Sequence, residues 1–370
     1  MYKLITTLPS EDGFRMPGEF EPHTRTWMLW PERPDNWRED AEPAQMAFVE
    51  VANAISQFEP VIMGVNPIQY DMARNLLPSD VQLVVLPNDD AWMRDCGPTF
   101  VIDKLSTVRG IDWKFNAWGG LEGGLYYPWE LDDAVPQKVL EMDELECYKA
   151  PIVLEGGSIH VDGQGTLITT EECLLNPNRN PSLSRSAIEM VLQSYLNVSK
   201  IIWLGRGVYN DETSGHVDNL CCFLRPGVLA LTWTDDKSDP QYEISQDALT
   251  RLENTSDAKG RNLVIHKIHQ PDPVTITDIE AQGVEKLPGT KPRIAGDRMA
   301  TSYVNFYLCN RGAVVPTFGD PHDQAALDKL QQLMPERKIV GVPAREILLG
   351  GGNIHCITQQ QPGGSEVIGD

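Results

Sequence analysis

The sequence predicts an α/β protein built as a closed ring of five repeated units. One order of elements, namely helix, strand, polar loop and hairpin, recurs along the chain. The loops open near positions 88, 155, 212, 297 and 350, an irregular period of roughly 65 residues. The loops, not the helices, carry most of the acidic residues, histidines and glycines, which places them together at the mouth of the ring. The alternative is a doubly wound α/β domain, in which helices and strands also alternate.

The first unit follows this order with two helices at the start, and the second unit follows it with one. Helical spacing of apolar residues predicts helices over 44–58 and 68–77, and a strand over 81–86 leads into the loop 88–98 and the strand 99–102. In the second unit, a helix over 133–145 precedes a strand at 152–154, the loop 155–157 and a hairpin through 163–165.

The third unit has the clearest pattern. Apolar side chains at 188, 191, 192, 195 and 196 predict an amphipathic helix over 185–196. Ser184 is its expected N-cap and Asn197 its expected stop. A buried strand over 200–204, the loop 205–215 and a hairpin of strands 217–224 and 228–233 should follow.

The last two units contain the same elements with a longer loop between them. In the fourth, a helix over 245–252 and a strand over 263–268 precede a loop to about 299, a strand over 303–308 and a turn at 310–312. In the fifth, a helix over 323–334 and a strand over 338–342 precede the loop that holds Gly350 to Cys356. We expect all five units to form one catalytic domain over 1–370.

Composition limits the classes of function. The chain has 370 residues, 41% of them hydrophobic, and acidic residues exceed basic ones by 53 − 31 = 22. A net charge of −22 argues against nucleic acid or an anionic membrane as a partner and suits a cationic small molecule. The seven cysteines form no CxxC pair, no signal peptide is visible and no apolar stretch is long enough to span a bilayer. We therefore expect a soluble, cytoplasmic protein without a disulfide framework.

The glycine run that ends at Cys356 is the most informative feature of the chain. Gly350, Gly351 and Gly352 let the backbone approach a ligand closely, and Cys356 is expected to open the strand that follows. Two other segments, 154–162 and 212–219, also pass from a Gly-rich or acidic loop to a histidine and then toward a strand. This shared context suggests one pocket.

The residues of these loops suit guanidinium chemistry. A cysteine thiolate is a nucleophile and a histidine transfers protons near neutral pH. Crowded carboxylates repel one another unless a cation lies among them, and a planar guanidinium matches carboxylates with two hydrogen bonds. The candidate set is Cys356, His216, Glu155, Asp95 and Asp218.

Five segments, in order, resemble the agmatine deiminase (agmatine iminohydrolase) family of the guanidine-modifying penteins, which is related to bacterial peptidyl-arginine deiminases. The segments are 88–98, 115–120, 155–157, 212–219 and 350–356, and the resemblance covers about 13–360. It implies a five-bladed α/β propeller with a central active site, and hydrolysis of agmatine to N-carbamoylputrescine and ammonia. It implies no metal or organic cofactor, and it suggests a homo-oligomer.

The resemblance also implies a role for each candidate. Cys356 would attack the guanidinium carbon and form a covalent amidino intermediate, and His216 would act as acid and base. Asp95 and Asp218 would hold the guanidinium nitrogens, and Glu155 would orient His216 or the substrate. Gly351 and Gly352 would admit the reacting group. The far end of agmatine would meet the following residues: Trp92, Trp118, Asp89, Asp90 and Glu212. With no basic cluster near these motifs, a substrate carboxylate should be rejected.

Several residues have simpler interpretations. Cys96, Cys221 and Cys222 are expected to be packed in the core, and His160 and Asp162, which repeat the spacing of His216 and Asp218, to be structural. His23 is expected at the surface, and His266, His269 and His322 are unassigned.

The same residues also allow other functions. They are a metal hydrolase that uses His160, His216 and His355 with Asp218 and Cys356, a papain-like amidase, an amidinotransferase, and a polyamine-binding or guanidine-binding protein.

Overall fold

Five separate mixed sheets make up the fold of the chain, for which a computed structural model describes residues 3–363. Four sheets are built from consecutive strands, apart from the short added strand β1, in these orders: β1 (Lys3–Ile5), β7 (Glu146–Val153), β6 (Val108–Lys114), β5 (Thr99–Ile102); β10 (Lys200–Leu204), β9 (Thr166–Thr170), β8 (Ile159–Val161); β11 (Cys221–Arg225), β12 (Val228–Trp233), β13 (Val264–His269); and β14 (Tyr307–Cys309), β15 (Gly312–Thr317), β16 (Lys338–Pro343). The fifth sheet joins the two ends of the chain, in the order β17 (Gln359–Pro362), β2 (His23–Leu29), β3 (Val61–Val65), β4 (Gln82–Val85).

Every sheet repeats one pairing pattern. An antiparallel pair comes first, and the second strand of that pair then accepts a parallel strand: β5–β6 with β7, β8–β9 with β10, β11–β12 with β13, β14–β15 with β16, and β17–β2 with β3. A parallel strand requires a crossover connection, which helices supply. An antiparallel pair with an added parallel strand therefore recurs in all five sheets. In four of them the pair is a hairpin of consecutive strands, as predicted, whereas in the fifth it joins β17 and β2 from the two ends of the chain.

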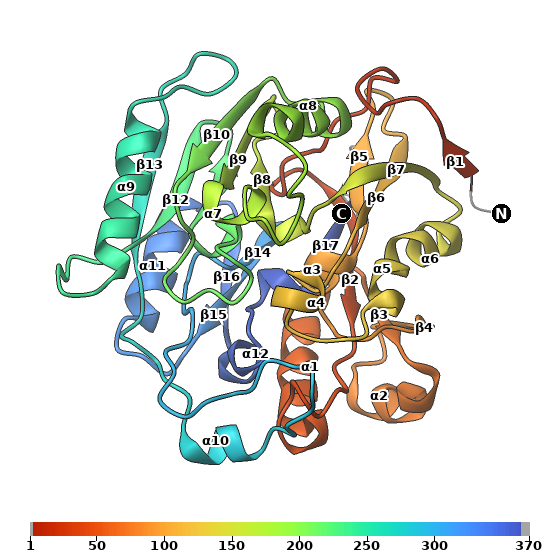
Figure 1. Cartoon of the computed structure of the whole chain (residues 1–370), viewed down its shortest axis with the longest axis vertical. Coiled ribbons are helices and arrows are strands. Elements are labelled where there is room, and N and C mark those ends of the chain that lie inside the picture. Colours follow the sequence, from red (N-terminus) through yellow and green to blue (C-terminus); the bar gives the residue numbers. More distant parts are fainter. Residues whose placement is uncertain (1–2, 364–370) are drawn as a thin grey trace.

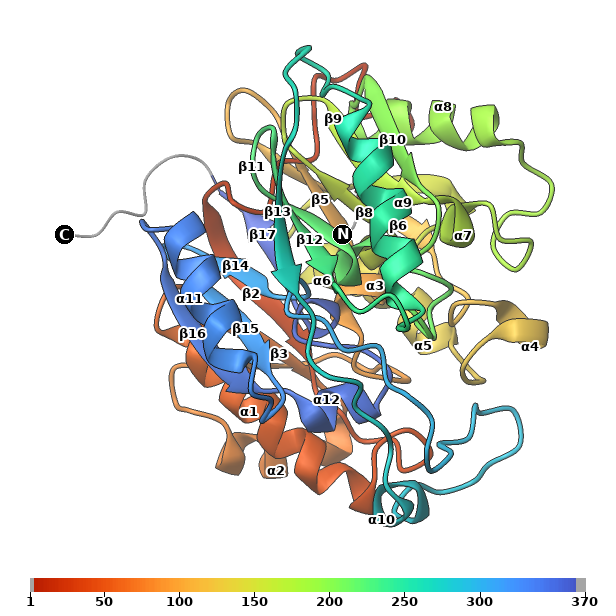
Figure 2. The same ribbon diagram turned by 90° about the vertical axis from the view of Figure 1, so that its left-hand side faces the viewer.

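The longer helices lie toward the outside of the molecule, whereas most strands and several short helices lie toward its middle (Figure 1). In Figures 1 and 2, α8 and α9 lie at the opposite end from α1 and α2. The α-helices are α1 (Glu42–Ser56), α2 (Tyr70–Leu76), α3 (Met93–Cys96), α4 (Gly120–Gly123), α5 (Glu130–Asp133), α6 (Val135–Met142), α7 (Glu171–Leu174), α8 (Arg185–Leu196), α9 (Gln241–Glu253), α10 (Asp278–Gln282), α11 (Asp323–Leu333) and α12 (Arg345–Leu349). Short 3-10 turns are η1 (Glu39–Ala41), η2 (Pro67–Gln69), η3 (Gly156–Ser158), η4 (Val217–Asn219) and η5 (His355–Ile357).

Helix α8 confirms the expectation for the third unit residue by residue. It buries Ile188, Leu192 and Leu196. The side chain of Ser184 caps its first turn by accepting from the backbone N–H of Ala187, and Asn197 ends it in the left-handed conformation with φ 56°. The strands over 200–204, 228–233 and 99–102 also match their predicted bounds.

The first strands of the fifth sheet were missed by the sequence analysis. Strands β2 and β3 flank α1, and β2 begins at His23, which was expected at the surface. That expectation is wrong because His23 is only 5% exposed and its Nδ1 lies 3.1 Å from Glu59 Oε1. A buried hydrogen-bonded pair thus stands where a surface residue was expected.

Three predicted strands begin later than expected. The segment from Val217 forms η4, and β11 starts only at Cys221. The strand expected from Tyr303 starts at Tyr307. Cys356 does not open a strand but lies in η5, ahead of β17. In each case a short turn precedes the strand and holds polar residues that a continuous strand would have spread over two faces.

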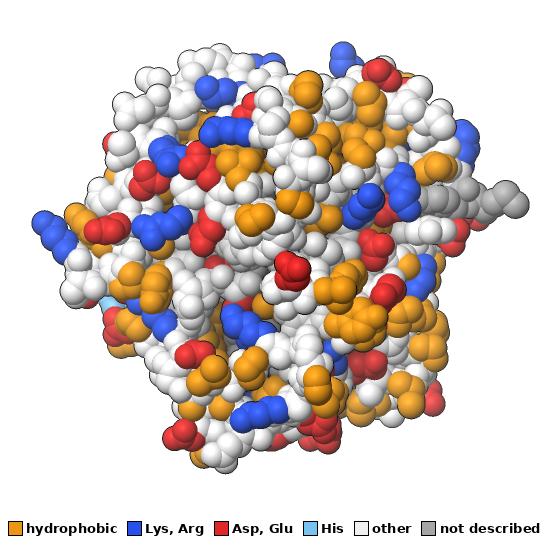
Figure 3. Space-filling model, in the orientation of Figure 1, with side chains coloured by type: hydrophobic (Ala, Val, Ile, Leu, Met, Phe, Trp, Pro, Cys, Tyr) orange, Lys and Arg blue, Asp and Glu red, His pale blue; other side chains and the backbone are white. Residues whose placement is uncertain are grey.

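The α/β class is confirmed, whereas the closed ring is not established by strand pairing, because no sheet closes on itself within residues 3–363. None of the helices in that range is long and apolar enough to cross a bilayer. Acidic, basic and apolar side chains are interspersed on the face shown in Figure 3, so the net charge is not gathered there.

Candidate active site

Four short helical turns bring the candidate residues together. The turns α3, η3, η4 and η5 stand at the same place in their units, just ahead of β5, β8, β11 and β17. Neighbouring turns contact one another, α3 with both η3 and η5, and η3 with η4. They carry Asp95, Gly157, Asp218 and Cys356 respectively.

Cys356 is buried among acceptors. Its Sγ lies 3.7 Å from Asp218 Oδ2 and 3.6 Å from Asn305 Oδ1, and the side chain is 3% exposed. Burial raises the pKa of this thiol well above its usual range, and the charges of Asp218 and Asp95 raise it further. The free site therefore holds a neutral thiol, which only an added positive charge nearby would help to ionise.

His216 lies between two carboxylates. Its Nδ1 is 3.8 Å from Asp95 Oδ2 and its Nε2 is 3.6 Å from Glu155 Oε2, and neither ring nitrogen has a hydrogen-bond partner among the described residues. Burial would lower the pKa of His216, but the charge of Asp95, a contact with Cys173 and the charge of Glu155 raise it well above the usual value. The imidazole is therefore protonated, and its N–H groups are available to a bound reactant.

Asp95 and Asp218 each keep part of their bonding capacity. Asp95 accepts from Trp118 Nε1 and from the backbone N–H of Gly157, both at 2.9 Å. Asp218 accepts at Oδ2 from His355 Nδ1 at 2.8 Å, and its Oδ1 has no partner within residues 3–363. Burial raises the pKa of Asp95 to about 6 although His216 opposes the rise. For Asp218, burial is outweighed by the hydrogen bond and charge of His355, which lower the pKa.

Glu155 is held by an arginine. Arg179 Nε donates to its Oε1 at 2.6 Å, and both side chains are fully buried. Burial is again outweighed, so that Arg179 and His216 lower the pKa of Glu155. Its Oε2, the atom near His216, has no hydrogen-bond partner in the described part of the chain.

Gly157 makes this close packing of charged groups possible. A Cβ at this position would lie 2.7 Å from His216 Nδ1 and 2.9 Å from both Asp218 Oδ2 and Asp95 Oδ1. Real Cβ atoms essentially never lie this close to other atoms, so any larger residue at position 157 would displace these charged groups.

A pocket of about 410 Å³ leads to Cys356. Its lining includes Asp95, Trp92, Trp118, Gly351 and Gly352, which were predicted to contact substrate. Trp92 stacks on Trp37 with ring centroids 5.2 Å apart, and a Cβ on Gly352 would lie 2.4 Å from Trp92. The pocket wall therefore combines aromatic rings with glycine backbone packed against Trp92, a lining that suits a flat, cationic group.

Asp89 and Asp90, two acidic candidates for binding the far end of the substrate, differ in their surroundings. Asp89 does not line the pocket, and its Oδ2 accepts from the backbone N–H of Leu131 at 2.8 Å. Asp90 lines the pocket but accepts from Trp37, Trp92 and Asn36 at 2.7–2.8 Å. Of the two, Asp89 is unsuited to hold a substrate, because its carboxylate faces the backbone of a neighbouring helix.

Glu212 pairs with two cations that the sequence analysis overlooked. Its Oε2 lies 2.5 Å from Arg293 Nη1 and its Oε1 3.2 Å from Lys291 Nζ, and both cations line the pocket. Burial is outweighed by these charges, which lower the pKa of Glu212. The expectation that no basic cluster lies near the motifs is therefore wrong. The long loop of the fourth unit places Lys291 and Arg293 next to Glu212 at the pocket.

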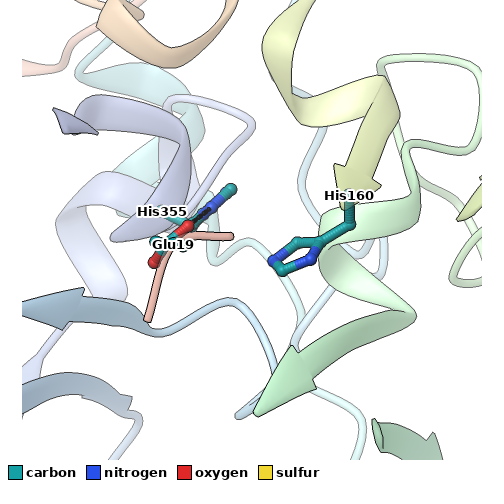
Figure 4. A group of neighbouring side chains, drawn as sticks. All are labelled: Glu19, His160 and His355. Carbon is teal, nitrogen blue, oxygen red and sulfur yellow. Dashed lines mark hydrogen bonds and ion pairs between the residues drawn. The ribbon is translucent and has the colours of Figure 1, made fainter. Parts of the chain in front are cut away.

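The metal-hydrolase alternative loses its ligand set in the fold. His160 and His355 group with Glu19, while His216 groups with Glu155 and Cys173. In Figure 4, His160 faces the hydrogen-bonded Glu19–His355 pair from the other side. His160 Nδ1 accepts from the backbone N–H of Phe223 at 3.3 Å, which fixes the ring proton on Nε2. The three histidines of the metal-hydrolase alternative are thus divided between two separate groups.

Comparison with known proteins agrees with this geometry. The sequence matches the Porphyromonas-type peptidyl-arginine deiminase family over residues 15–362. The chain belongs to this family. It is 58% identical to the agmatine deiminase of Pseudomonas aeruginosa (strain LESB58), with 96% of this chain and 98% of that protein covered.

Solved structures of family members have the same fold. The agmatine deiminase of Enterococcus faecalis, described as catalysing its reaction, superposes with a TM-score of 0.96 at 50% identity, covering 98% of this chain and 100% of that one. A Cys→Ser variant of the C. jejuni agmatine deiminase with substrate bound superposes with a TM-score of 0.81 at 25% identity, covering 94% and 96%. The predicted membership among the agmatine deiminases is confirmed.

Besides Lys291 and Arg293, four residues that contact the candidate site were not assigned to it from the sequence. They are Glu19, Arg179, Asn305 and His355. His355 adjoins Cys356 and could have been found from that adjacency, and Asn305 stands just before the inner strand of the fourth unit, where the other units have Asp95, Gly157 and Asp218. Glu19 and Arg179 lie in irregular segments without any local pattern.

Proposed function

We propose that this protein hydrolyses agmatine to N-carbamoylputrescine and ammonia through a covalent intermediate on Cys356. One observation supports this most: Cys356 Sγ lies at the wall of an aromatic pocket, with His216 and three carboxylates grouped behind it, in a chain 58% identical to an agmatine deiminase. A guanidinium group would add positive charge next to Asp95 and Asp218. It would hydrogen-bond to Asp95 and to the free Oδ1 of Asp218.

Binding of the cation prepares the thiol. The charges that raise the pKa of Cys356 are those of Asp218 and Asp95, after burial itself. A guanidinium among them offsets those charges, so the thiol releases its proton to solvent through the pocket once the substrate is bound. The thiolate then attacks the guanidinium carbon, forming the C–S bond.

His216 carries the protons of both half-reactions. Its imidazolium donates a proton to one amino nitrogen of the adduct, the C–N bond breaks and ammonia leaves, taking the proton that the thiol released. The neutral imidazole next accepts a proton from water as the hydroxyl adds to the carbon. The C–S bond then breaks, the added hydroxyl passes its proton to the thiolate, and a urea group remains on the product.

The pocket also supports a choice among guanidines. The ammonium of agmatine would approach Glu212, whose carboxylate lies beside Gly351, while Lys291 and Arg293 keep that carboxylate ionised. These two cations are the groups that a substrate carboxylate would meet, so arginine is the informative competitor.

The decisive experiment measures ammonia release from agmatine, arginine and a blocked arginyl peptide, with each product identified by mass. We expect agmatine alone to exchange an imino group for oxygen. Comparable specificity for arginine would refute the assignment of substrate, and release that requires an added amine would indicate amidinotransfer instead.

Cys356→Ala tests the nucleophile, with Cys309→Ala as a matched control because Cys309 is a buried cysteine on β14. The Cys356 variant should bind agmatine without releasing ammonia, and the control should retain turnover. In addition, mass spectrometry of the wild-type protein, acid-quenched during turnover of agmatine, should detect the amidino adduct on Cys356. Undiminished ammonia release by Cys356→Ala would refute the covalent mechanism.

We also infer that the five sheets are the blades of one propeller around this site, within a single catalytic domain. The repeated pairing in each sheet supports this, as does the pairing of the C-terminal β17 with the N-terminal β2. Removal of the chain from β17 onward should therefore destabilise all five sheets together, so that denaturant unfolds the truncated protein in a single transition. Separate unfolding transitions would argue for independent parts.

A further inference from the structure

A buried hydrogen-bonded chain runs from the candidate nucleophile away from the pocket. Asp218 Oδ2, 3.7 Å from Cys356 Sγ, accepts from His355 Nδ1 at 2.8 Å. His355 Nε2 lies 2.7 Å from Glu19 Oε2 (Figure 4). Asp218, His355 and Glu19 are each 5% exposed or less.

The hydrogen bonds define the charge of His355. Both ring nitrogens face carboxylate oxygens, and an ionised carboxylate can only accept. Both nitrogens must therefore carry protons, which makes the ring an imidazolium between two carboxylates. Burial and the charge of Arg94 would lower the pKa of His355, whereas Glu19 and Asp218 raise it.

Four charged or titratable groups face His355, each from a different segment. Asp218 comes from η4 and Glu19 from the segment before β2. Arg94 on α3 donates from Nε to the His355 backbone carbonyl at 3.3 Å, and its Nη2 lies 3.6 Å from Glu19 Oε2. His160 on β8 stacks at 6.1 Å between ring centroids, and burial lowers its pKa to about 4, so it adds no charge at neutral pH.

We propose that His355 and Glu19 are positioning residues for the reaction of the neighbouring Cys356. The His355 imidazolium, held by Glu19, binds Oδ2 of Asp218, keeps that carboxylate ionised and leaves its Oδ1 free for the guanidinium. This role goes beyond the five catalytic residues and rests on the proposed function, because it acts through the substrate contact of Asp218.

The geometry explains why the Asp218–His355 pair needs Glu19 to keep Asp218 ionised. Asp218 is buried beside the thiol and near Asp95, surroundings that favour a neutral carboxyl. His355 alone would lose its proton in the same burial, and Glu19 prevents this loss. Glu19 is itself fixed, because its Oε1 accepts from the backbone N–H of Leu308 at 2.8 Å.

The test compares Glu19→Gln with a matched control elsewhere. Asp257 is likewise buried and binds Arg261, and none of the groups that donate to its carboxylate belongs to the candidate site, so Asp257→Asn removes one negative charge from a buried pair outside that site. For Glu19→Gln we expect kcat/KM for agmatine to fall about tenfold near neutral pH and further as pH rises, because its His355 deprotonates more readily. Asp257→Asn should change kcat/KM by a constant factor at every pH.

Two outcomes would overturn the proposal. One is a Glu19→Gln profile parallel to that of the wild type, which would leave Glu19 a purely structural role. The other is His355→Gln with wild-type kcat/KM. A wild-type protein that does not turn over agmatine would refute the proposed function instead.

A measurement on the wild-type protein keeps the proposal testable if the variants do not fold. NMR of histidine-labelled protein reports the protonation of each of the seven rings. His355 should remain an imidazolium at about pH 8, where an unperturbed histidine is neutral. A neutral His355 ring at that pH would contradict the proposal whether or not agmatine is the substrate.

Discussion

The tripeptide His-Val-Asp occurs twice in this chain and serves two different purposes. At His160 to Asp162 it lies on and just after β8, and at His216 to Asp218 it leads into η4, with His216 five positions before β11 begins at Cys221. Asp162 accepts from the Gln164 and Thr166 backbone N–H groups, both at 2.8 Å, and thereby closes a hairpin turn. Asp218 instead lies beside Cys356.

The difference comes from the position of the tripeptide in the repeated unit. The middle residue of the turn before the inner strand is Gly157 in the second unit and Asp218 in the third. In the second unit the histidine falls on the strand itself, beyond the turn. Identical residues thus gain or lose access to the site according to their register relative to one short turn.

The largest contrast should be between the two histidines. His216→Gln should lower kcat for agmatine about 10⁴-fold, since the acid and base of both half-reactions is removed. His160→Gln should leave kcat within about threefold and lower the free energy of unfolding by about 1 kcal/mol, through its bond from the Phe223 N–H. Steady-state ammonia release and urea denaturation measure the two effects.

A similar loss of kcat in both histidine variants would break the comparison, because it would place His160 in the reaction. His266→Gln is a suitable third variant, since His266 lies on β13 outside both segments.

The two aspartates should separate activity from stability. Asp218→Asn should lower kcat/KM about 10²–10³-fold, because a charge that holds the guanidinium is lost while the side chain keeps its shape. Asp162→Asn should leave kcat/KM of the folded protein unchanged and lower the free energy of unfolding by about 1–3 kcal/mol. The Asp162→Asn variant loses stability because Asp162 Oδ2 also accepts from Thr166 Oγ1 at 2.7 Å.

Denaturation curves for both aspartate variants decide the point. An Asp218→Asn protein that loses activity only in proportion to its unfolded fraction would make Asp218 structural, as Asp162 is.

Gly157→Ala should have a smaller effect, yet it tests the register argument directly. The added methyl group must push apart His216, Asp95 and Asp218, which we expect to lower kcat/KM by up to about 100-fold. Gly260→Ala is the control, because its φ of +76° strains an added Cβ but no atom lies within 4 Å. Equal losses of activity in the two variants would show that crowding at Gly157 is not specific to the site.

The sequence predicted regular elements well where periodicity sets them. Helix α8 has its apolar stripe, its cap and its stop in one local segment, and β5, β10 and β12 are continuous apolar runs. It predicted the members of the site largely through the resemblance, since the two His-Val-Asp segments cannot be told apart locally.

The features that could not be predicted from the sequence depend on long-range packing. The short turns η4 and η5 have no periodicity that separates them from the strands they precede. Glu19 is distant from His355 in sequence, and Arg293 is distant from Glu212, so their pairing follows from the fold alone. The same holds for His23, where a sequence typical of a surface loop conceals a buried pair with Glu59.

The pH dependence should show the smallest effect and sharpen the comparison further. Burial raises the pKa of Asp95 to about 6, so in the free protein Asp95 gains a proton as pH falls through that value. Protonated Asp95 cannot attract the guanidinium, and kcat/KM for agmatine should therefore fall about tenfold for each pH unit below about 6. Asp162→Asn should keep this acidic limb, because Asp162 does not contact the site. A profile that stays flat to about pH 5 would show that the ionised form of Asp95 is not required. Asp218, whose pKa His355 lowers, would then be the carboxylate on which binding depends.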